Sequence, residues 1–407
     1  MGRQQLRSRC VLIGGGCVVA LVAWRVPARA ERQYIPIPEV IVDPNEGTTV
    51  GLLGVVLMSN DETKSISSIF APDVRYNDSF GIYPTLRYFG YPDPNTHFTV
   101  IAGKATKQGE DVEAEYSRHA MFDGWFDVFG RVQHEEDPFE RFYGIGNETP
   151  SSNETNYGST TDGGSIFGGL NVYGPWEVSL ALRLSQERIG HGGVNSLPQL
   201  RDSSSGFSNV NGADGATVVG TRFGLTYDTR DQHDIPTQGF FAAAGVEPVD
   251  ESLGASSSYI KYDLEAKAFV PLRSDKRFII ALHSALDYLQ HGEQAPFYEL
   301  SSVGGIHSLR AYGTHRFTDN DRFVFQGELR SNVYEREIFG VHAHLEVAPF
   351  LDAGQVFHTS REFPLEDLHI IGGCGFRAVV VPQVVAYVDV GTSGGAPAAF
   401  TGIDYPF

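Results

Sequence analysis

Histidines and carboxylates stand two or four residues apart at two places, a spacing at which side chains on a β-strand share one face. His283 precedes Asp287, and His342 and His344 precede Glu346. A histidine beside a carboxylate could act as a general base, and two histidines on one face could begin a metal site. Alternate residues share a face on every strand, however, so a polar lining explains the spacing without chemistry. We therefore predict no catalytic residues, no metal and no cofactor.

A lone arginine in an apolar, glycine-containing stretch points to an ion pair instead. Arg310 lies in GGIHSLRAYG, Gly304 to Gly313, which reads as a loop. A guanidinium held by two carboxylates is a strong and geometrically selective arrangement. Burying an arginine without such partners is costly. Arg310 is therefore either exposed on an ordinary loop or held by acidic side chains.

The elements around these residues are short strands. From about residue 47 onward, period-two alternation runs in segments of roughly ten residues, bounded by Gly, Asn, Asp or Pro. In 260–270 one face carries Ile, Tyr, Leu, Ala and Val, and the other carries Lys, Asp and Glu. The segments at 176–187, 322–332 and 341–347 repeat this pattern.

Charges of both signs on the second face of strand after strand favour a water-filled lumen over a sheet packed on a sheet. Long polar connections (148–162 and 190–215) alternate with tight ones such as 272–276. We predict an all-β protein, a transmembrane antiparallel β-barrel of about 16 strands, an even number being the rule for bacterial barrels.

The two ends of the chain fit a bacterial outer membrane. Residues 1–30 combine arginines, an apolar run and Ala28-Arg29-Ala30, as a secretory signal peptide does. We expect a short periplasmic segment over 31–46 and the barrel over 47–407. At the other end, Gly402, Tyr405 and Phe407 resemble the terminal signal by which outer-membrane barrels are recognised for insertion. Pro406 suggests that the last residue pairs loosely.

Composition argues against nucleic acid as a partner and against a disulfide. The chain has a net charge of −19, and −24 once the five arginines of the signal peptide are removed. Nucleic acid is therefore not an expected partner. Cys374 is the one cysteine that remains, so no intramolecular disulfide is possible.

Three stretches resemble the bacterial surface antigen family, the barrel shared by the Bam and Tam outer-membrane assembly factors and by two-partner secretion transporters. They are TYDTRDQHDIPTQGFF (226–241), GGIHSLRAYG (304–313) and PFLDAGQVF (349–357), with a weaker match in FYGIGNETP (142–150). The second resembles the family's long sixth extracellular loop, which folds into the lumen. Its motif residues here would be Gly304, Gly305, Leu309, Arg310 and Tyr312.

The resemblance implies partners for the arginine. If the family's arrangement holds here, Arg310 would bond to Glu328 and Asp352 on the interior faces of neighbouring strands. The alternation independently turns Glu328 inward. Ala311 stands where the family signature has glycine. The segment before the barrel is too short for the periplasmic domains that the assembly factors bear.

Three functions remain open at this stage. The barrel would assist insertion or translocation of proteins at the outer membrane, with a weakly paired seam between its first and last strands templating an incoming strand. Alternatively, it would be a channel or structural barrel without assembly activity. A membrane-embedded enzyme is the third and least favoured. Expected partners are outer-membrane lipid, the barrel assembly machinery during its own insertion, and outer-membrane or secreted client proteins.

Overall fold

The computed structural model of the protein describes residues 32–59, 66–233, 235–338, 341–359, 367–380, 384–395, 397–403 and 405–407. The predicted signal peptide, residues 1–30, lies outside the described residues.

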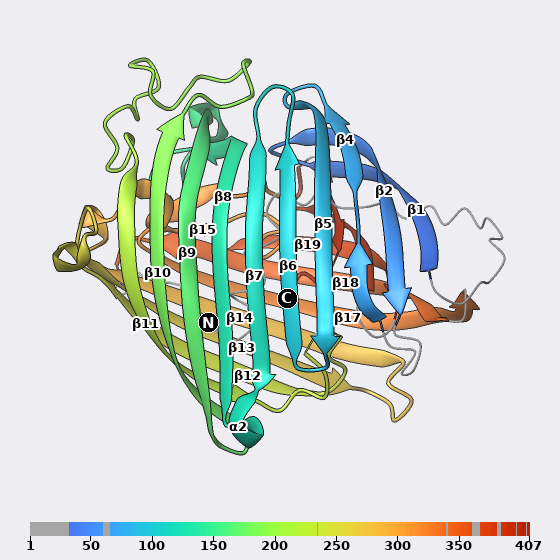
Figure 1. The fold of residues 1–407 in the computed structure, drawn as a ribbon. Helices are drawn as coiled ribbons and strands as arrows, with labels where there is room; N and C mark the ends of the chain where they lie inside the picture. The colour runs from blue at the N-terminus through green and yellow to red at the C-terminus, as the bar shows by residue number, and fades with distance from the viewer. Residues whose placement is uncertain are drawn as a thin grey trace.

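The described chain forms one antiparallel sheet of nineteen strands and a separate sheet of two (Figure 1). The large sheet contains β1 (Arg32–Asp43), β2 (Gly47–Ser59), β3 (Ile66–Phe70), β4 (Asp73–Asn77), β5 (Gly81–Asp93), β6 (Thr96–Lys104), β7 (Glu110–Ala120), β8 (Phe126–Phe142), β9 (Thr155–Tyr173), β10 (Trp176–Gly190), β11 (Ala216–Asp228), β12 (Gly239–Val249), β13 (Tyr259–Pro271), β14 (Phe278–Gln290), β17 (Asp321–Ile338), β18 (Val341–Phe357), β19 (His369–Val380), β20 (Val384–Thr392) and β21 (Ala398–Ile403). The small sheet pairs β15 (Ser301–Val303) with β16 (Phe317–Asp319).

Helical elements are few and short among the described residues. They are α2 (Met121–Gly124) and the 3-10 turns η2 (Ser151–Asn153), η3 (Glu251–Leu253), η4 (Gly292–Gln294) and η5 (Phe297–Glu299). No helix in the described part of the chain is long and apolar enough to cross a membrane.

The strand count differs from the expected sixteen. β3 and β4 both lie between β2 and β5, so the nineteen strands occupy eighteen positions in the described sheet. Ala71 and Pro72 interrupt that shared position, because proline cannot donate to the ladder. The connection expected over 148–162 is also shorter, since β9 begins at Thr155.

The sheet of the structure begins before the boundary expected at residue 47. Most of the segment 31–46 forms β1, which pairs with β2 from Arg32↔Met58 to Asp43↔Gly47. Pro36 and Pro38 disguised this strand in the sequence, since prolines within a run of residues argue against a central strand.

The sheet curls until its first and last strands, β1 and β21, lie side by side. We call their boundary the seam. Figure 1 shows the resulting wall, with β5 to β11 crossing in front of β12 to β14 and β17.

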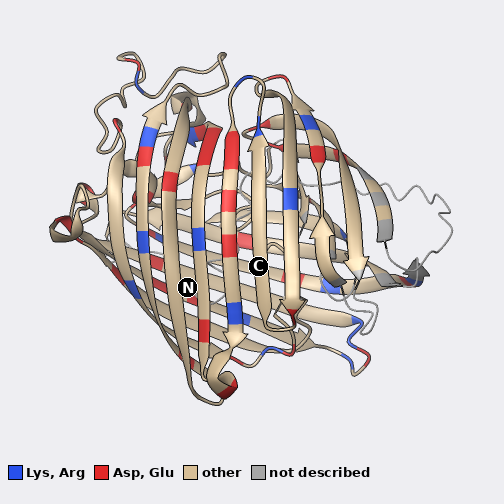
Figure 2. Ribbon diagram, viewed as in Figure 1, with Lys and Arg blue, Asp and Glu red and all other residues tan. Residues whose placement is uncertain are grey.

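The alternation in the sequence corresponds to the two faces of this wall. On β10, Leu180 and Leu184 are exposed whereas Glu177 is buried, and on β17 Gln326 and Glu328 are buried. Figure 2 shows charged residues on the strands themselves as well as in the connections. Apolar side chains outside and charged ones inside are the pattern of a transmembrane barrel, which confirms the predicted fold class.

The connections differ in length at the two ends of the barrel. The longest connections, 143–154, 191–215 and 291–320, lie at one end together with shorter ones such as 105–109, while 121–125, 174–175, 272–277 and the ten-residue 229–238 lie at the other. Long outer loops and short periplasmic turns place the first end outside the cell.

Candidate functional site

The long connection 291–320, between β14 and β17, folds into the lumen as predicted. We call it the lumen loop. β15 and β16 join its two legs, and Gly304 and Gly305 begin the turn with φ of 127° and 85°, which favour glycine. Leu309 is fully buried in a cluster with Val303 and Phe317 of the loop and with Phe350 and Ile371 of the wall.

Arg310 is fully buried at the inner end of the loop and meets three carboxylates. Its Nε and Nη2 donate to the two oxygens of Asp352, at 2.9 and 2.6 Å. Its Nη1 donates to Glu328 Oε1 at 2.5 Å and to Asp389 Oδ2 at 2.8 Å. The structure thus brings together Arg310, Glu328 and Asp352, and adds Asp389 from β20. We call these four residues the first anchor.

Two further arginines surround Glu328. Arg377 of β19 donates to both of its oxygens, at 2.8 and 2.6 Å, and also to Glu346 at 3.2 Å. Arg330 of β17 donates to Glu328 Oε2 at 3.0 Å. Three guanidinium groups thus face four carboxylates, a near balance that compensates for the removal of these charges from water.

The electrostatics keep the loop arginine charged. Burial by itself would lower the pKa of Arg310, but Asp352, Glu328 and Asp389 outweigh it and raise that pKa. The guanidinium also lies over the ring of Phe350, 3.6 Å from its centroid.

The wall makes room for this close approach. A Cβ atom at Gly391 of β20 would collide with the backbone oxygen of Arg310, so glycine lets the loop approach the strand there. Ala311, where the family signature has glycine, is absent from the positive-φ positions of the described chain. Alanine is therefore accommodated at that position.

The outer leg of the lumen loop carries a second anchor, which sequence reasoning missed. Glu299 of η5 accepts from Arg183 Nη1 and Nη2 at 2.9 and 3.0 Å, and from Lys261 Nζ at 2.6 Å. Tyr259 OH adds a bond at 3.2 Å. Burial alone would raise the pKa of Glu299, but Arg183 and Lys261 outweigh it and hold that pKa well below its usual range. We call Glu299, Arg183 and Lys261 the second anchor.

The motif at 142–150 lies against the lumen loop. Gly146 N donates to Thr318 O at 2.8 Å, and Arg316 Nη2 donates to Thr149 O at 2.7 Å. Asn147 connects the same segment to β18, because its Oδ1 accepts from Val356 N at 3.0 Å. A second connection therefore covers the loop, and Tyr312 packs edge-on against Phe317 beside it.

The residues of the predicted C-terminal signal are divided between sheet and lumen. Gly402 lies in β21, where a Cβ atom would collide with the ring of Tyr387 on β20. Tyr405 and Phe407 have left the sheet and are buried inside the barrel. Their role as an insertion signal stays a prediction.

The candidate chemical residues have other partners. His283 contacts Gln326 Oε1 at 3.0 Å and Glu265 Oε1 at 3.2 Å, and Asp287 pairs with Arg322 at 2.6 Å. No group of three or more His, Cys, Asp or Glu in the described part of the chain could hold a metal ion. The side chain of His342 lies outside the described residues.

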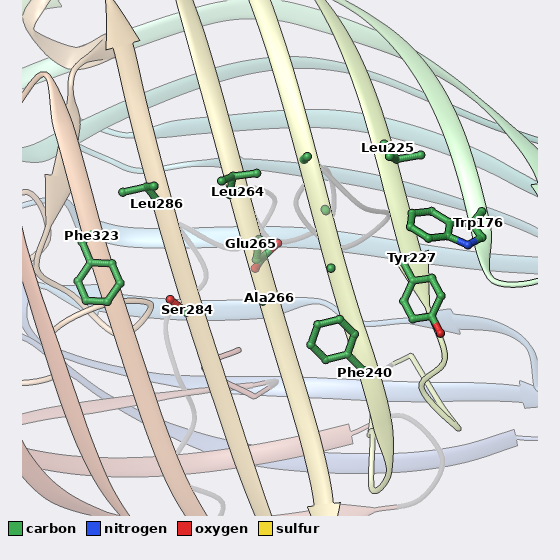
Figure 3. A pocket seen from close by; sticks show the side chains of 13 residues that line it. Trp176, Leu225, Tyr227, Phe240, Leu264, Glu265, Ala266, Ser284, Leu286 and Phe323 are labelled. Carbon is green, nitrogen blue, oxygen red and sulfur yellow. The ribbon is translucent and has the colours of Figure 1, made fainter. Parts of the chain in front are cut away.

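A hollow of about 760 Å³ lies over β10 to β14 and β17, and its lining is mostly apolar, with Glu265 and Ser284 as the polar members (Figure 3). Trp176, Tyr227 and Phe240 stand along one side of it, and Ala266 and Ser284 lie among larger apolar side chains. A largely apolar surface of this kind suits acyl chains.

Taken together, the sheet, its inverted polarity and the buried loop arginine define an outer-membrane β-barrel with a loop fixed in its lumen. The model of the Omp85 superfamily domain matches residues 98–375, and the chain belongs to that superfamily.

Three solved structures are similar to this chain to different degrees. BamA from Haemophilus ducreyi lacking POTRA domains 1–3 has a TM-score of 0.56 at 15% identity, over 91% of this chain and 75% of that one. CdiB from Acinetobacter baumannii gives 0.49 at 12% identity, over 93% of this chain and 60% of that one. CdiB from Escherichia coli gives 0.43 at 12% identity, over 94% and 62%.

Proposed function

We propose that this barrel assists the insertion or translocation of other proteins at the outer membrane, without a covalent step, and that its seam opens to do so. The observation that carries the proposal is the weakness of the seam. Among the described residues, no backbone ladder joins β1 to β21. The hydroxyl of Thr401 bridges them, accepting from Val42 N and donating to Val40 O, both at 3.4 Å.

The length of the two strands adds to this weakness. β1 contains twelve residues and β21 only six, so β21 cannot cover the whole edge of β1. An uncovered strand edge presents unpaired N–H and C=O groups to which an extended segment can add.

A channel or structural barrel without assembly activity is the second candidate, and the prolines of β1 favour it. N–H and C=O groups of one residue face the same edge of an antiparallel strand, and alternate residues face opposite edges. Val40 and Val42 face the seam, so Pro36 and Pro38, of the same parity, face it as well. Neither proline has an N–H to offer, which makes this edge a poorer template.

A reversible closure of the seam tests the proposal. Val40→Cys and Thr401→Cys, in a background lacking other cysteines, would be joined by a short reducible crosslinker and reconstituted into liposomes. The measured quantity is the rate at which an unrelated unfolded barrel protein inserts. We expect acceleration over empty liposomes by the open protein, none by the crosslinked protein, and recovery after reduction.

The same sample provides its own control, because the crosslinked and reduced proteins differ only at the seam. Equal acceleration before and after reduction would exclude seam opening. If the folded barrel gives no acceleration in either state, it has no assembly activity by itself, and the channel or structural candidate stands.

A further inference from the structure

The chain leaves the sheet after β21 and enters the lumen. β21 ends at Ile403, and Tyr405 and Phe407 are each 8% exposed. In Figure 1 the C-terminal mark lies within the outline of the barrel. Tyr405 packs with Ile235, with Val379 of β19 and with Val385 of β20, and the further contacts of residues 405–407 reach β13, β14, β17 and β18 along the wall.

Phe407 packs in a buried apolar cluster against β13 and β14. Phe269, Ile279 and Ala281 form a buried cluster with it, and His283 stacks on its ring with centroids 5.3 Å apart. Phe269 and Ala281 have the parity of the buried, lumen-facing Lys267 and His283. Apolar side chains are unexpected on the face of the wall that lines a water-filled lumen. Packing of Phe407 against them removes them from water.

Tyr405 and the backbone that follows it are held by polar groups. The guanidinium of Arg330 lies 3.7 Å from the ring centroid of Tyr405, and Tyr405 OH donates to Glu346 Oε2 at 3.2 Å. Arg330 Nη2 donates to Phe407 O at 3.4 Å. His307 of the lumen loop bonds through Nδ1 to Pro406 O at 2.8 Å. Burial lowers the pKa of His307, which suits a neutral ring that donates this bond.

These contacts connect the segment to the first anchor. Arg330 bonds to Glu328 as well as to residue 407, and Glu328 is a direct partner of Arg310. Arg377, which bonds to the same Glu328, lies 5.1 Å from the ring centroid of Tyr405. The loop and the segment after β21 therefore share one set of buried charges.

We propose that Phe269, Ile279, Ala281, His283, Arg330 and Glu346 form a binding site for an aromatic peptide segment, which we call the lumen aromatic site. Residues 405–407 are its intramolecular occupant. Their binding keeps the chain after Ile403 from pairing with the N-terminal half of β1. The two prolines act in the same direction, because Pro36 and Pro38 offer no donors to an extended β21.

The position of Phe407 can be measured directly in the folded full chain. 4-Fluorophenylalanine at position 407 would report, by ¹⁹F NMR in nanodiscs, its relaxation by a water-soluble paramagnetic chelate. The same probe at Phe122, which is 74% exposed, provides the reference for an open position. We expect the resonance at 407 to be relaxed several-fold less than the resonance at 122.

Two variants would empty the site by different means. Ala281→Leu places a larger side chain where the ring of Phe407 now packs, and Arg330→Gln removes the charge beneath Tyr405. Both should raise the paramagnetic relaxation at 407 several-fold. Ala268→Leu is the matched control, because it makes the same change on the outer face of the same wall. Ala281→Leu leaves every charge in place, so it tests the site even where Arg330→Gln prevents folding.

Two results would contradict the proposal. Equal relaxation at 407 and 122 in the unaltered protein would overturn the proposal. So would a protected resonance at 407 that Ala281→Leu moves no more than Ala268→Leu does. Neither readout involves a client protein, so the lumen aromatic site stands or falls independently of the insertion activity proposed above.

Discussion

The two anchors hold one loop but differ in their contact with water. In the first anchor, the side chains of Arg310, Glu328, Asp352 and Asp389 are all fully buried. In the second, Arg183 is 21% exposed, Lys261 23% and Glu299 10%. A charge without access to water must keep its partner, whereas a partly hydrated charge can exchange its partner for water.

This difference predicts different responses to the loss of one member. The first anchor should lose most of its stabilisation at once, because without Arg310 the buried Asp352 would be an uncompensated charge, while Glu328 and Asp389 would keep only Arg377 and Arg330. The second should weaken gradually. The first anchor is therefore suited to fixing one loop position, and the second to limiting how the outer leg moves.

The largest effect is expected for Arg310→Ala. It leaves Asp352 and Asp389 without their main partner, and should lower the free energy of unfolding by about 3–5 kcal/mol. Equilibrium unfolding in urea, followed by tryptophan fluorescence, measures it. Arg273→Ala, at a side chain 65% exposed in a turn, is the control and should change little. Similar values for the two variants would show that the first anchor contributes no net stability.

Glu299→Gln should have a smaller effect, because Arg183 and Lys261 can reach water when the carboxylate is lost. Arg183 also retains its bond to Glu247 at 2.8 Å. We expect a loss of about 1–2 kcal/mol, the range of a hydrogen bond to a charged group reduced by hydration. A loss as large as that of Arg310→Ala would mean that hydration does not distinguish the anchors.

The two anchors should also be independent of each other. β15 and β16 close the inner part of the lumen loop into a lobe that packs on the wall, and Glu299 lies outside that lobe. The double variant Arg310→Ala, Glu299→Gln should therefore lose the sum of the two single losses to within about 0.5 kcal/mol. A larger deviation would indicate that the loop couples the two anchors energetically.

The same contrast explains what the sequence could predict. Arg310, Glu328 and Asp352 were predictable because a recognisable motif carries the arginine and because the alternation turns Glu328 inward. For Asp389 the only signal in the sequence is the alternation of its strand. Its ion pair with Arg310 depends on β20 lying two strands from β18, which the sequence does not indicate. Glu299 precedes the motif in an irregular turn, where no periodicity places a side chain.

Two features of the structure are not predicted by the strand pattern. Pro36 and Pro38 hide β1 in the sequence, and the terminal motif does not indicate that residues 405–407 enter the lumen. Among the described residues, β1 has a ladder on one side only, to β2, and residues 405–407 lie beyond the last ladder, inside the barrel. Tertiary contacts decide there, and the strand pattern that predicts the rest of the wall carries no information about Arg330 or Phe269.

The smallest effect concerns pH and a third contact of the lumen loop. His315 Nδ1 lies 2.9 Å from Glu140 Oε2 on β8. Burial lowers the pKa of His315, but Glu140, with a contribution from Asp137, outweighs it and raises that pKa. A histidine with a raised pKa stabilises the folded protein fully below its unfolded pKa, about 6.5. That contribution disappears as the pH rises through the folded pKa.

The difference in urea midpoint between the protein and His315→Gln should therefore be largest in acid and shrink above neutral pH. It should stay below the effect of either anchor, because the His315 side chain is 38% exposed and can be hydrated. His291→Gln, whose ring is 56% exposed, is the matched control and should change the urea midpoint little. A difference at His315 that is constant with pH would mean that the contact is made by a neutral ring, and that only the two anchors hold the loop by charge.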